Sequence, residues 1–386
     1  MAGTVAPGGV NPPAVPDPRA GTDTRFALAT TADDAAIRRL LRDNHMPGFV
    51  RLTFEREPDY FHGANLAGAH DETIVAYTSR GQLVCAGRCS RRPGWLDGAP
   101  APVGYLAELR LDAAARGRFR VVRDGYRFFA AQRPPGDATF YFTSVAADNF
   151  RARRFLERGA RGMPTYHFLA ELTTLLVAVP RHPRPSTRLQ VSAATPDDLP
   201  TLQRLLAAHG ERHQLAAVWS ADTLRALPRH GLPLDHFLVA HADGTPVGCG
   251  ALWDQRAFRQ TVIHGYTLGG LVPAYNLLAP LFSAPRLPRP GSTLAHGFLS
   301  PLALEKPVAG LLPDFVAAFF PLARRAGLDY LTLALPATDG RLSALRRRFA
   351  TRAYASRLYQ VTWPGEEPPS AFPVEGHPFL PDVALL

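Results

Sequence analysis

The chain has 386 residues, of which 46% are hydrophobic and 20% are charged, a composition that excludes intrinsic disorder and collagen-like structure for most of its length. At ~100–200 residues per domain, this length predicts two domains or one large one. The formal net charge of +10 comes from 43 Lys and Arg residues against 33 Asp and Glu residues, and only one of the 43, Lys306, is a lysine.

The basic excess is spread along the whole chain and is not gathered in a tail or an aromatic-rich stripe. We therefore do not expect a nucleic-acid partner, because such partners are held by a clustered basic footprint. The preference for Arg over Lys, together with abundant Ala, Gly and Pro, is typical of a GC-rich coding sequence.

Residues 1–24 are rich in Pro and Gly and have neither a basic start nor an apolar core, which predicts a disordered tail and not a signal peptide. No stretch approaches 18 uninterrupted apolar residues, so no membrane span is expected. The three cysteines, Cys85, Cys89 and Cys249, are too few for a disulfide framework. These features predict a cytoplasmic protein with structural thiols.

The first predicted elements are a short strand over residues 26–30 and a helix that starts at Thr31-Ala-Asp-Asp34. A Thr cap followed by acidic residues in the first turn is typical of a helix start. The apolar residues that follow share one helical face; they are Ile37, Leu40 and Leu41.

Two strands over residues 73–77 and 82–87 predict a hairpin, and a strand over 140–145 leads through Asp148-Asn149 into an Arg-rich helix. The same order of signals returns in the second half of the chain, at residues 189–193, Thr195, 236–252 and 330–335. The chain therefore follows one plan twice.

The spacing of this repeat changes along the chain. Thr195 follows Thr31 by 164 residues and Gly244 follows Gly81 by 163, but Asp339 follows Asp148 by 191. The second half therefore has an insertion of about 28 residues, and the Pro-rich stretch at about 255–293 is its natural place, as a lid or an interface loop.

Residues 105–111 predict a strand that continues through small residues and Gly117 into a helix reaching residue 131. A strand that turns into a helix in this way leaves unpaired backbone amides at the helix N-terminus, where anions bind. The guanidinium groups around this turn suit phosphate oxygens; they belong to Arg116, Arg118, Arg120 and Arg123. We therefore expect a pyrophosphate ligand.

Two motifs here resemble those of the GCN5-related N-acetyltransferases (GNATs), in a tandem version because both halves follow one plan. Arg116-Gly-Arg-Phe-Arg-Val121 stands where the family has Arg/Gln-x-x-Gly-x-Gly/Ala, with Phe119 and Val121 replacing the small residues. Asn149-Phe-Arg-Ala-Arg-Arg-Phe-Leu-Glu-Arg-Gly159 matches Asn-x-x-Ala-x-x-x-aromatic-Glu-x-x-Gly, with Leu at the aromatic position.

The resemblance implies an α/β (α+β) fold of two tandem lobes, each a mixed, mostly antiparallel central sheet flanked by helices. Residues 25–179 are then an N-terminal GNAT-like domain with the acetyl-CoA site, and 180–188 a Pro-rich linker. Residues 189–363 are a degenerate C-terminal copy without the Arg–Gly loop, and a Pro-rich tail follows over 364–386.

For the chemistry, the resemblance implies transfer of an acetyl group from acetyl-CoA to a primary amine of a small molecule or peptide by direct attack. The amine needs a base and the thioester carbonyl needs backbone donors. Glu108 is the first candidate base and Glu55 and Glu57 are the next; the alternatives are a salt bridge for Glu108 and a solvated loop for the other two. Tyr141 or Tyr126 would supply an acid, or simply pack.

The acetyl-CoA contacts that the resemblance implies are Leu109, Arg110, Leu111, Arg116, Gly117, Arg118, Phe119, Arg120, Val121 and Asn149. No metal is expected, because His209 and His213 lack the order of a zinc motif. The two lobes would form an internal pseudo-dimer in a monomer or a homodimer. The alternative function is a catalytically degenerate module that binds a CoA ester or a protein partner.

Overall fold

The computed structural model describes residues 24–46, 50–115, 117, 119–134, 137–183, 189–279, 286–305, 310–366 and 376–386. Arg116, Arg118 and Lys306, singled out above, lie outside these described residues, as do residues 1–23 and 367–375 of the two expected tails.

Each half of the chain alternates strands with helices. The elements of the first half are β1 (Thr24–Leu28), α1 (Asp34–Asp43), β2 (Val50–Glu55), β3 (His70–Thr78), β4 (Leu83–Leu96), β5 (Ala99–Leu111), α2 (Phe119–Gln132), β6 (Phe140–Ala146), α3 (Phe150–Glu157) and β7 (Thr165–Ala178). Those of the second half are β8 (Gln190–Ala193), α4 (Leu199–Gly210), α5 (Ala221–Ala226), β9 (Phe237–Ala242), β10 (Thr245–Trp253), β11 (Gln260–Tyr266), α6 (Val272–Leu278), β12 (His296–Leu304), α7 (Leu312–Ala318), α8 (Phe320–Arg325), β13 (Tyr330–Pro336), α9 (Arg341–Arg348) and β14 (Thr351–Thr362).

Twelve strands form one sheet, in the order β1-β3-β4-β5-β6-β14-β7-β13-β12-β10-β9-β8. Read inward from its two edges, β1-β3-β4-β5-β6 of the first half matches β8-β9-β10-β12-β13 of the second. The pairs β5–β6 and β12–β13 are parallel and the other neighbours are antiparallel. The expected fold class, two lobes with mixed and mostly antiparallel sheets flanked by helices, is confirmed.

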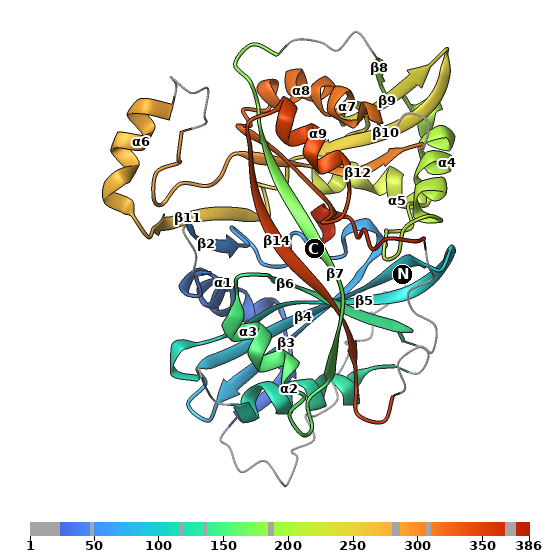
Figure 1. The fold of residues 1–386 in the computed structure, drawn as a ribbon. Helices are drawn as coiled ribbons and strands as arrows, with labels where there is room; N and C mark the ends of the chain where they lie inside the picture. Colours follow the sequence, from blue (N-terminus) through green and yellow to red (C-terminus); the bar gives the residue numbers. More distant parts are fainter. Residues whose placement is uncertain are drawn as a thin grey trace, which may run out of the picture.

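The last strand of each half crosses to the other lobe. β14 pairs with β6 of the first half, and β7 pairs with β13 of the second half. β7 and β14 also pair with each other from Thr351 to Thr362, and both run through the middle of the molecule (Figure 1). The lobes therefore share a continuous sheet, and separating them would break all of these backbone hydrogen bonds.

Both repeated helix starts are capping boxes. In the second half, the backbone N–H of Thr195 donates to Asp198 Oδ2 at 2.8 Å, as expected. In the first half the cap is Thr30, whose N–H donates to Asp33 Oδ2 at 2.7 Å. The expectation of a cap at Thr31 was wrong by one residue, because two adjacent aspartates satisfy the sequence pattern and only Asp33 makes the box.

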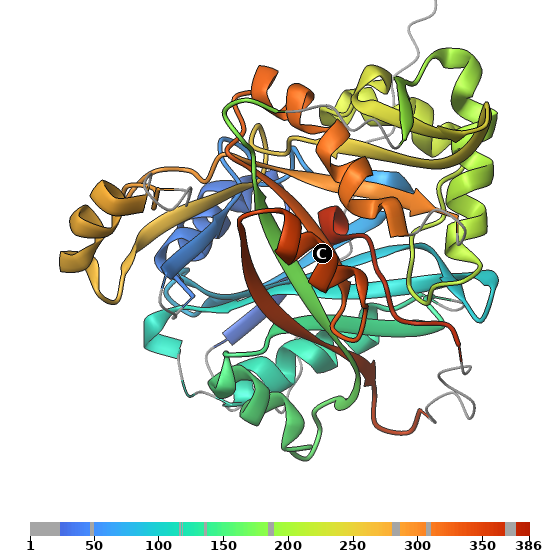
Figure 2. The ribbon, with the colours of Figure 1, turned by 45° about the horizontal axis from the view of Figure 1, so that its top comes forward.

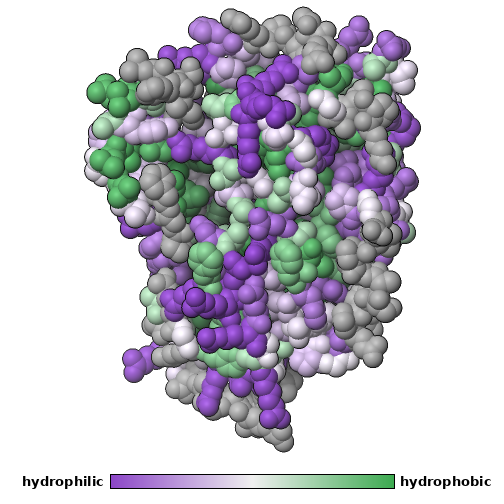
Figure 3. Space-filling view, in the orientation of Figure 1, coloured by the Kyte–Doolittle hydropathy of each residue, from purple (hydrophilic) through white to green (hydrophobic). Residues whose placement is uncertain are grey.

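The insertion expected at about 255–293 joins the two halves. It contains β11, which pairs with β2 of the first half from Gln260 opposite Glu55 to Tyr266 opposite Val50. Helix α6 follows and stands away from the sheet on the left of Figure 1. Figure 3 shows hydrophobic side chains at this place, and the exposed leucines here are Leu268, Leu271, Leu277 and Leu278.

Candidate functional site

The predicted strand over residues 105–111 has a bulge in the structure. Two β5 residues, Glu108 and Leu109, lie opposite the single β4 residue Gly87. Glu108 has a φ of 55°, a left-handed conformation that is uncommon for a residue with a side chain. A bulge interrupts the hydrogen-bond ladder between strands, and backbone N–H groups released in this way can bind a ligand.

The strands β5 and β6 separate next to this bulge. Their parallel pairing ends at Leu106 with Thr143, although β5 continues to Leu111 and β6 to Ala146. A cavity of about 410 Å³ lies at the opening, lined by both strands, by α2 and α3, and by parts of the second half. In Figures 1 and 2, α2 and α3 lie together below these strands. The volume is that of a small-molecule site.

The two faces of β5 near the bulge differ in chemistry. Leu109 packs with Cys85 and Val121 on the face that α2 covers. Glu108 makes its contacts on the other face, with Arg56 after β2 and with Tyr60. The cavity therefore has an apolar side that faces α2 and a charged side that faces β2 and the second half of the chain.

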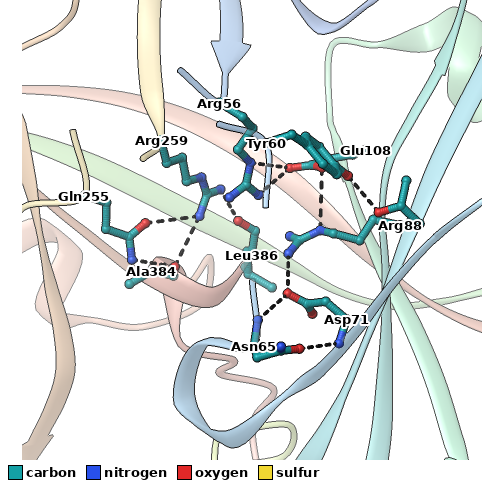
Figure 4. A network of polar contacts seen from close by, with 11 residues as sticks. Arg56, Tyr60, Asn65, Asp71, Arg88, Glu108, Gln255, Arg259, Ala384 and Leu386 are labelled. Atoms are coloured by element: carbon teal, nitrogen blue, oxygen red, sulfur yellow. Dashed lines mark hydrogen bonds and ion pairs between the residues drawn. The ribbon is translucent and has the colours of Figure 1, made fainter. Parts of the chain in front are cut away.

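Glu108 is the centre of a polar network on the charged side (Figure 4). Arg56 Nε donates to Glu108 Oε1 at 2.9 Å, and the hydroxyl of Tyr60 donates to Oε2 at 3.0 Å. Arg88 Nε lies 3.6 Å from Oε2, and Arg88 Nη1 lies 3.2 Å from Asp71 Oδ2. The carboxylate is thus held from three sides.

This network fixes the charge of Glu108. Burial raises the pKa of its carboxyl, but the guanidinium groups of Arg56 and Arg88 outweigh burial and hold the pKa well below its ordinary value of 4.5. Glu108 is therefore ionised near neutral pH. A carboxylate with so low a pKa accepts a proton poorly, so Glu108 is a weak general base. The alternative role expected for Glu108, a salt bridge, is present with Arg56 and Arg88.

Four of the residues expected to contact acetyl-CoA line the cavity; they are Leu109, Arg110, Val121 and Asn149. The Asn149 side chain caps α3, with Oδ1 accepting from the N–H of Ala152 at 3.2 Å. Leu111, Gly117, Phe119 and Arg120 are not among the residues lining the cavity.

Phe119 and Arg120 form the first turn of α2, directly after Gly117, which has a φ of 88°. Leu111 packs in the apolar cluster of Val84 and Ala115. Of the residues that the sequence singled out here, the ones around the opening are Leu109 and Arg110 of β5, Val121 of α2 and the α3 cap Asn149.

The structure does not bring Glu55 or Glu57, the other two candidate bases, to the cavity. Glu57 accepts hydrogen bonds from Arg38 and Arg42 of α1, and Glu55 accepts one from the Thr53 hydroxyl at 2.7 Å. Neither lines the cavity, and both belong to the junction with β11.

Tyr141 lies on β6 where β5 and β6 are still paired, two residues before the two strands separate. Its hydroxyl donates to Asp137, and its ring packs against Trp363 at 4.9 Å between centroids. Tyr126, the second tyrosine considered, does line the cavity. Its hydroxyl contacts that of Tyr166, and burial raises its pKa to about 12, so the phenol stays protonated.

The second half contributes residues that the sequence did not single out. Arg259, just before β11, reaches the cavity with a guanidinium whose pKa burial lowers to about 10. His296 opens β12; its Nδ1 lies 2.9 Å from the Thr332 hydroxyl and its Nε2 3.3 Å from that of Thr261. Burial lowers the pKa of His296 to about 4, so the ring is neutral near pH 7. No local pattern marks either residue, because only the lobe packing brings them here.

The matching opening of the second lobe holds a much smaller cavity. It lies between β12 and β13, whose parallel pairing ends at Phe298 with Thr332. The space left there is about 40 Å³, and residues 380–383 form part of its wall. Asp382 in this segment accepts from the N–H of Ala217 at 2.9 Å and from the Ser300 hydroxyl at 3.2 Å, which holds the segment in place.

In the part of the chain that the structure describes, no helix combines the length and the apolar character needed to cross a membrane. Within the same described residues, no group of three or more His, Cys, Asp or Glu side chains is arranged to hold a metal ion. His209 and His213, which were considered as metal ligands, stack on each other with ring centroids 4.0 Å apart.

The fold is similar to that of solved acyltransferases. A GCN5-related N-acetyltransferase from Sphaerobacter thermophilus aligns with a TM-score of 0.53 and 13% identity over 90% of this chain and 98% of that one. N-myristoyltransferase of Saccharomyces cerevisiae, solved with myristoyl-CoA bound, aligns with a TM-score of 0.57 and 11% identity over 91% and 85%.

A third similar structure is a region of a fungal multi-domain β-N-acetylglucosaminidase, described as a GCN5-related glucosamine N-acetyltransferase. It aligns with a TM-score of 0.58 and 14% identity over 90% of this chain and 39% of that one. Neither a scan against models of protein families nor a search of curated proteins gives a match. The chain thus has the GNAT fold in two lobes, as the resemblance implied.

Proposed function

We propose that the chain is an acyl-CoA-dependent N-acyltransferase that transfers an acetyl group from acetyl-CoA to a primary amine. The observation that carries this proposal is the bulge at Glu108, which opens onto a cavity of about 410 Å³ beside the first turn of α2. The likeness of the fold to N-acetyltransferases supports it. The fold alone would not, since one fold serves many reactions.

The donor would lie across the opening between β5 and β6. The N-terminus of α2 offers unpaired N–H groups and the positive end of the helix dipole to the phosphates. The acyl end would then reach the bulge, where backbone N–H groups near Leu109 can stabilise the negative charge that develops on the thioester oxygen. Asn149, which caps α3, and Ala152 of α3 border the same opening.

In the proposed reaction, the nitrogen lone pair of the amine attacks the thioester carbonyl carbon. The C–N bond forms, the C–S bond breaks, and the thiolate of CoA leaves. The amine nitrogen loses a proton to solvent, and the thiolate takes one up. A CoA thiol with a pKa near ~8.5 is a fair leaving group, so Leu156 in place of an acid does not prevent turnover.

The amine must be neutral when it attacks, and the cavity favours that state. Arginines from both halves line it, and nearby positive charge lowers the pKa of a bound ammonium group. We therefore assign Glu108 a positioning role: it holds Arg56 and Arg88 at the charged side of the cavity. The proton of the amine does not need Glu108 as its acceptor.

We place the reaction in the first lobe. The cavity at the opening between β12 and β13 measures only about 40 Å³, and residues 380–383 form part of its wall. The second lobe instead supplies Arg259 and His296 to the wall of the first-lobe cavity. Its role is to complete the acceptor side of the site.

Calorimetric titration with acetyl-CoA tests donor binding, and a thiol-release assay with small amines, aminoglycosides, polyamines and peptides tests transfer. We expect one binding site per chain and thiol release that requires an amine. No binding at high micromolar acetyl-CoA would refute the proposal. Binding without thiol release from any acceptor would favour the alternative, a module that binds a CoA ester without turnover.

A further inference from the structure

The cavity is lined by more positively charged than negatively charged side chains. Of the described side chains that line it, one is a carboxylate, Glu108, and four are guanidinium groups; these belong to Arg56, Arg88, Arg110 and Arg259. His296 adds no positive charge near neutral pH. Positive charge in a partly buried space costs free energy unless an anion compensates it.

Two of the four arginines are neutralised by carboxylates of the protein. Arg56 and Arg88 share Glu108, and Arg88 also pairs with Asp71 at 3.2 Å. The two carboxylates, Glu108 and Asp71, therefore balance the charges of the two guanidinium groups. This part of the site needs no ligand to neutralise it. Asn65 donates its N–H to Asp71 Oδ2 at 2.9 Å and so fixes the outer end of the network (Figure 4).

Arg259 is held by oxygens of the C-terminal segment. Its Nη1 donates to the main-chain oxygen of Ala384 at 3.2 Å and lies 3.5 Å from Gln255 Oε1. Its Nη2 donates to a main-chain oxygen of Leu386 (Figure 4). Both ends of this guanidinium group are therefore engaged by the protein.

Arg110 differs from the other three. It lies two residues after Glu108, and its Nη1 donates to the carbonyl of its neighbour Leu109 at 3.1 Å. No carboxylate of the described residues forms an ion pair with it. Burial lowers its pKa, and the opposing influence of Glu108 does not cancel this, yet an arginine stays charged near neutral pH. Only Nη1 of this guanidinium group has a hydrogen-bond partner among the described residues, so Nε and Nη2 can bind a ligand.

We propose that the amine acceptor carries a carboxylate and that Arg110 binds it. The inference rests on the proposed N-acyl transfer and deepens it by giving the acceptor's chemical class, an amino acid or a similar amino carboxylate. A planar carboxylate accepts two parallel hydrogen bonds from one guanidinium group. Arg110 supplies one positive charge without an ion-pair partner among the described residues. A carboxylate has one negative charge and balances it, whereas a phosphate with two negative charges does not.

The test compares molecules that differ only in the carboxylate. N-Acetylleucine and N-acetylphenylalanine, which have no ionisable amine, are titrated into the protein saturated with CoA, next to their carboxamides. We expect at least one acid to bind about tenfold or more tightly than its amide, the gain of a charge-assisted pair. Equal binding of acid and amide, or no binding of either acid, overturns the inference.

Variants of Arg110 test whether this residue causes the preference for the acid over the carboxamide. Arg110→Gln should remove the preference for the acid, and Arg110→Lys should keep part of it, since it keeps the charge but loses the fork. Arg80→Gln, at an exposed turn, removes the same charge and should leave the preference intact. Thermal unfolding of each variant shows that it is folded. A preference that survives in folded Arg110→Gln contradicts the role of Arg110.

Turnover separates this inference from the proposed function. Leucine and phenylalanine should release thiol faster than their carboxamides, and faster than phosphoethanolamine. Thiol release that favours phosphoethanolamine over every amino carboxylate overturns the carboxylate class. If no amine releases thiol but acids still bind in preference to amides, the proposed reaction fails and the anion site stands.

Discussion

Arg56 donates from Nε to Glu108 Oε1 at 2.9 Å, although 52 residues separate the two in the chain. The side chain of Arg56 is 5% exposed and that of Glu108 16%, so the pair is largely withdrawn from water. This contact fixes the bulged strand to the segment after β2. It makes Glu108 a structural anchor of the site, and several measurements follow from that role.

Glu108→Gln should destabilise the protein strongly. The substitution leaves Arg56 and Arg88 without their shared carboxylate, and breaking a buried ion pair typically costs ~3–5 kcal/mol. Tyr60→Phe, which removes only hydroxyl contacts to Glu108 and Thr73, should cost about 1–2 kcal/mol. Denaturant unfolding of both variants measures this difference. Equal stability of wild type and Glu108→Gln would contradict the anchoring role.

The stabilisation by Glu108 should depend on pH in a defined direction. Its folded-state pKa lies below the ordinary value of 4.5, so the folded protein binds fewer protons at this group than the unfolded chain does. The stability difference between wild type and Glu108→Gln should be constant above that value and shrink as the pH falls below it. A difference that grows on acidification would contradict the ion pair.

The pH dependence of turnover separates anchoring from proton transfer. If the neutral amine attacks directly, kcat/KM should rise with pH as the acceptor amine loses its proton. Glu108→Gln should lower kcat/KM without changing the shape of that profile. A profile that becomes flat in the variant would identify Glu108 as the general base and would contradict our assignment.

His296 should also make the protein less stable in acid, but because a neutral ring is buried and not because an ionised carboxylate is paired. Its folded-state pKa is about 4, against an ordinary 6.5, so the unfolded chain binds a proton between these values while the folded ring does not. Stability should therefore fall as the pH is lowered from 6.5 to 4, by an amount on the order of 3 kcal/mol for this group. His296→Gln should lose that part of the fall. An unchanged pH dependence in the variant would rule out the buried neutral state.

Ala152→Leu tests the opening between β5 and β6. Ala152 lies in α3 and lines the cavity, so a leucine side chain would extend into the space assigned to the donor. Acetyl-CoA should bind about tenfold or more weakly, as titration can show. Ala131→Leu, the same change at an exposed position of α2, is the matched control and should bind normally. Equal affinity of both variants would place the donor elsewhere.

The elements whose signals are local were predictable from the sequence. α1 buries Ile37, Leu40 and Leu41, as their helical spacing indicated, and Asn149 does cap the helix it was expected to open. The strand predicted over residues 105–111 is present as the end of β5. Each of these features depends on residues close in the chain, for which periodicity and capping patterns are informative.

The features formed by distant residues were not predictable in this way. The insertion of β14 between β6 and β7 leaves no local pattern, because its hydrogen bonds join strands from opposite halves. The contact of Arg56 with Glu108, and the arrival of Arg259 and His296 at the cavity, depend on how the lobes pack. In a chain with this many arginines, sequence alone could not tell which of them would meet the one carboxylate at the bulge.

A crystal structure of the protein with acetyl-CoA would show whether the first-lobe cavity binds the donor. We expect the pantetheine arm between β5 and β6, the pyrophosphate at the first turn of α2, and the acyl group beside Glu108 and Leu109. A donor bound instead between β12 and β13, beside residues 380–383, would refute the first-lobe site.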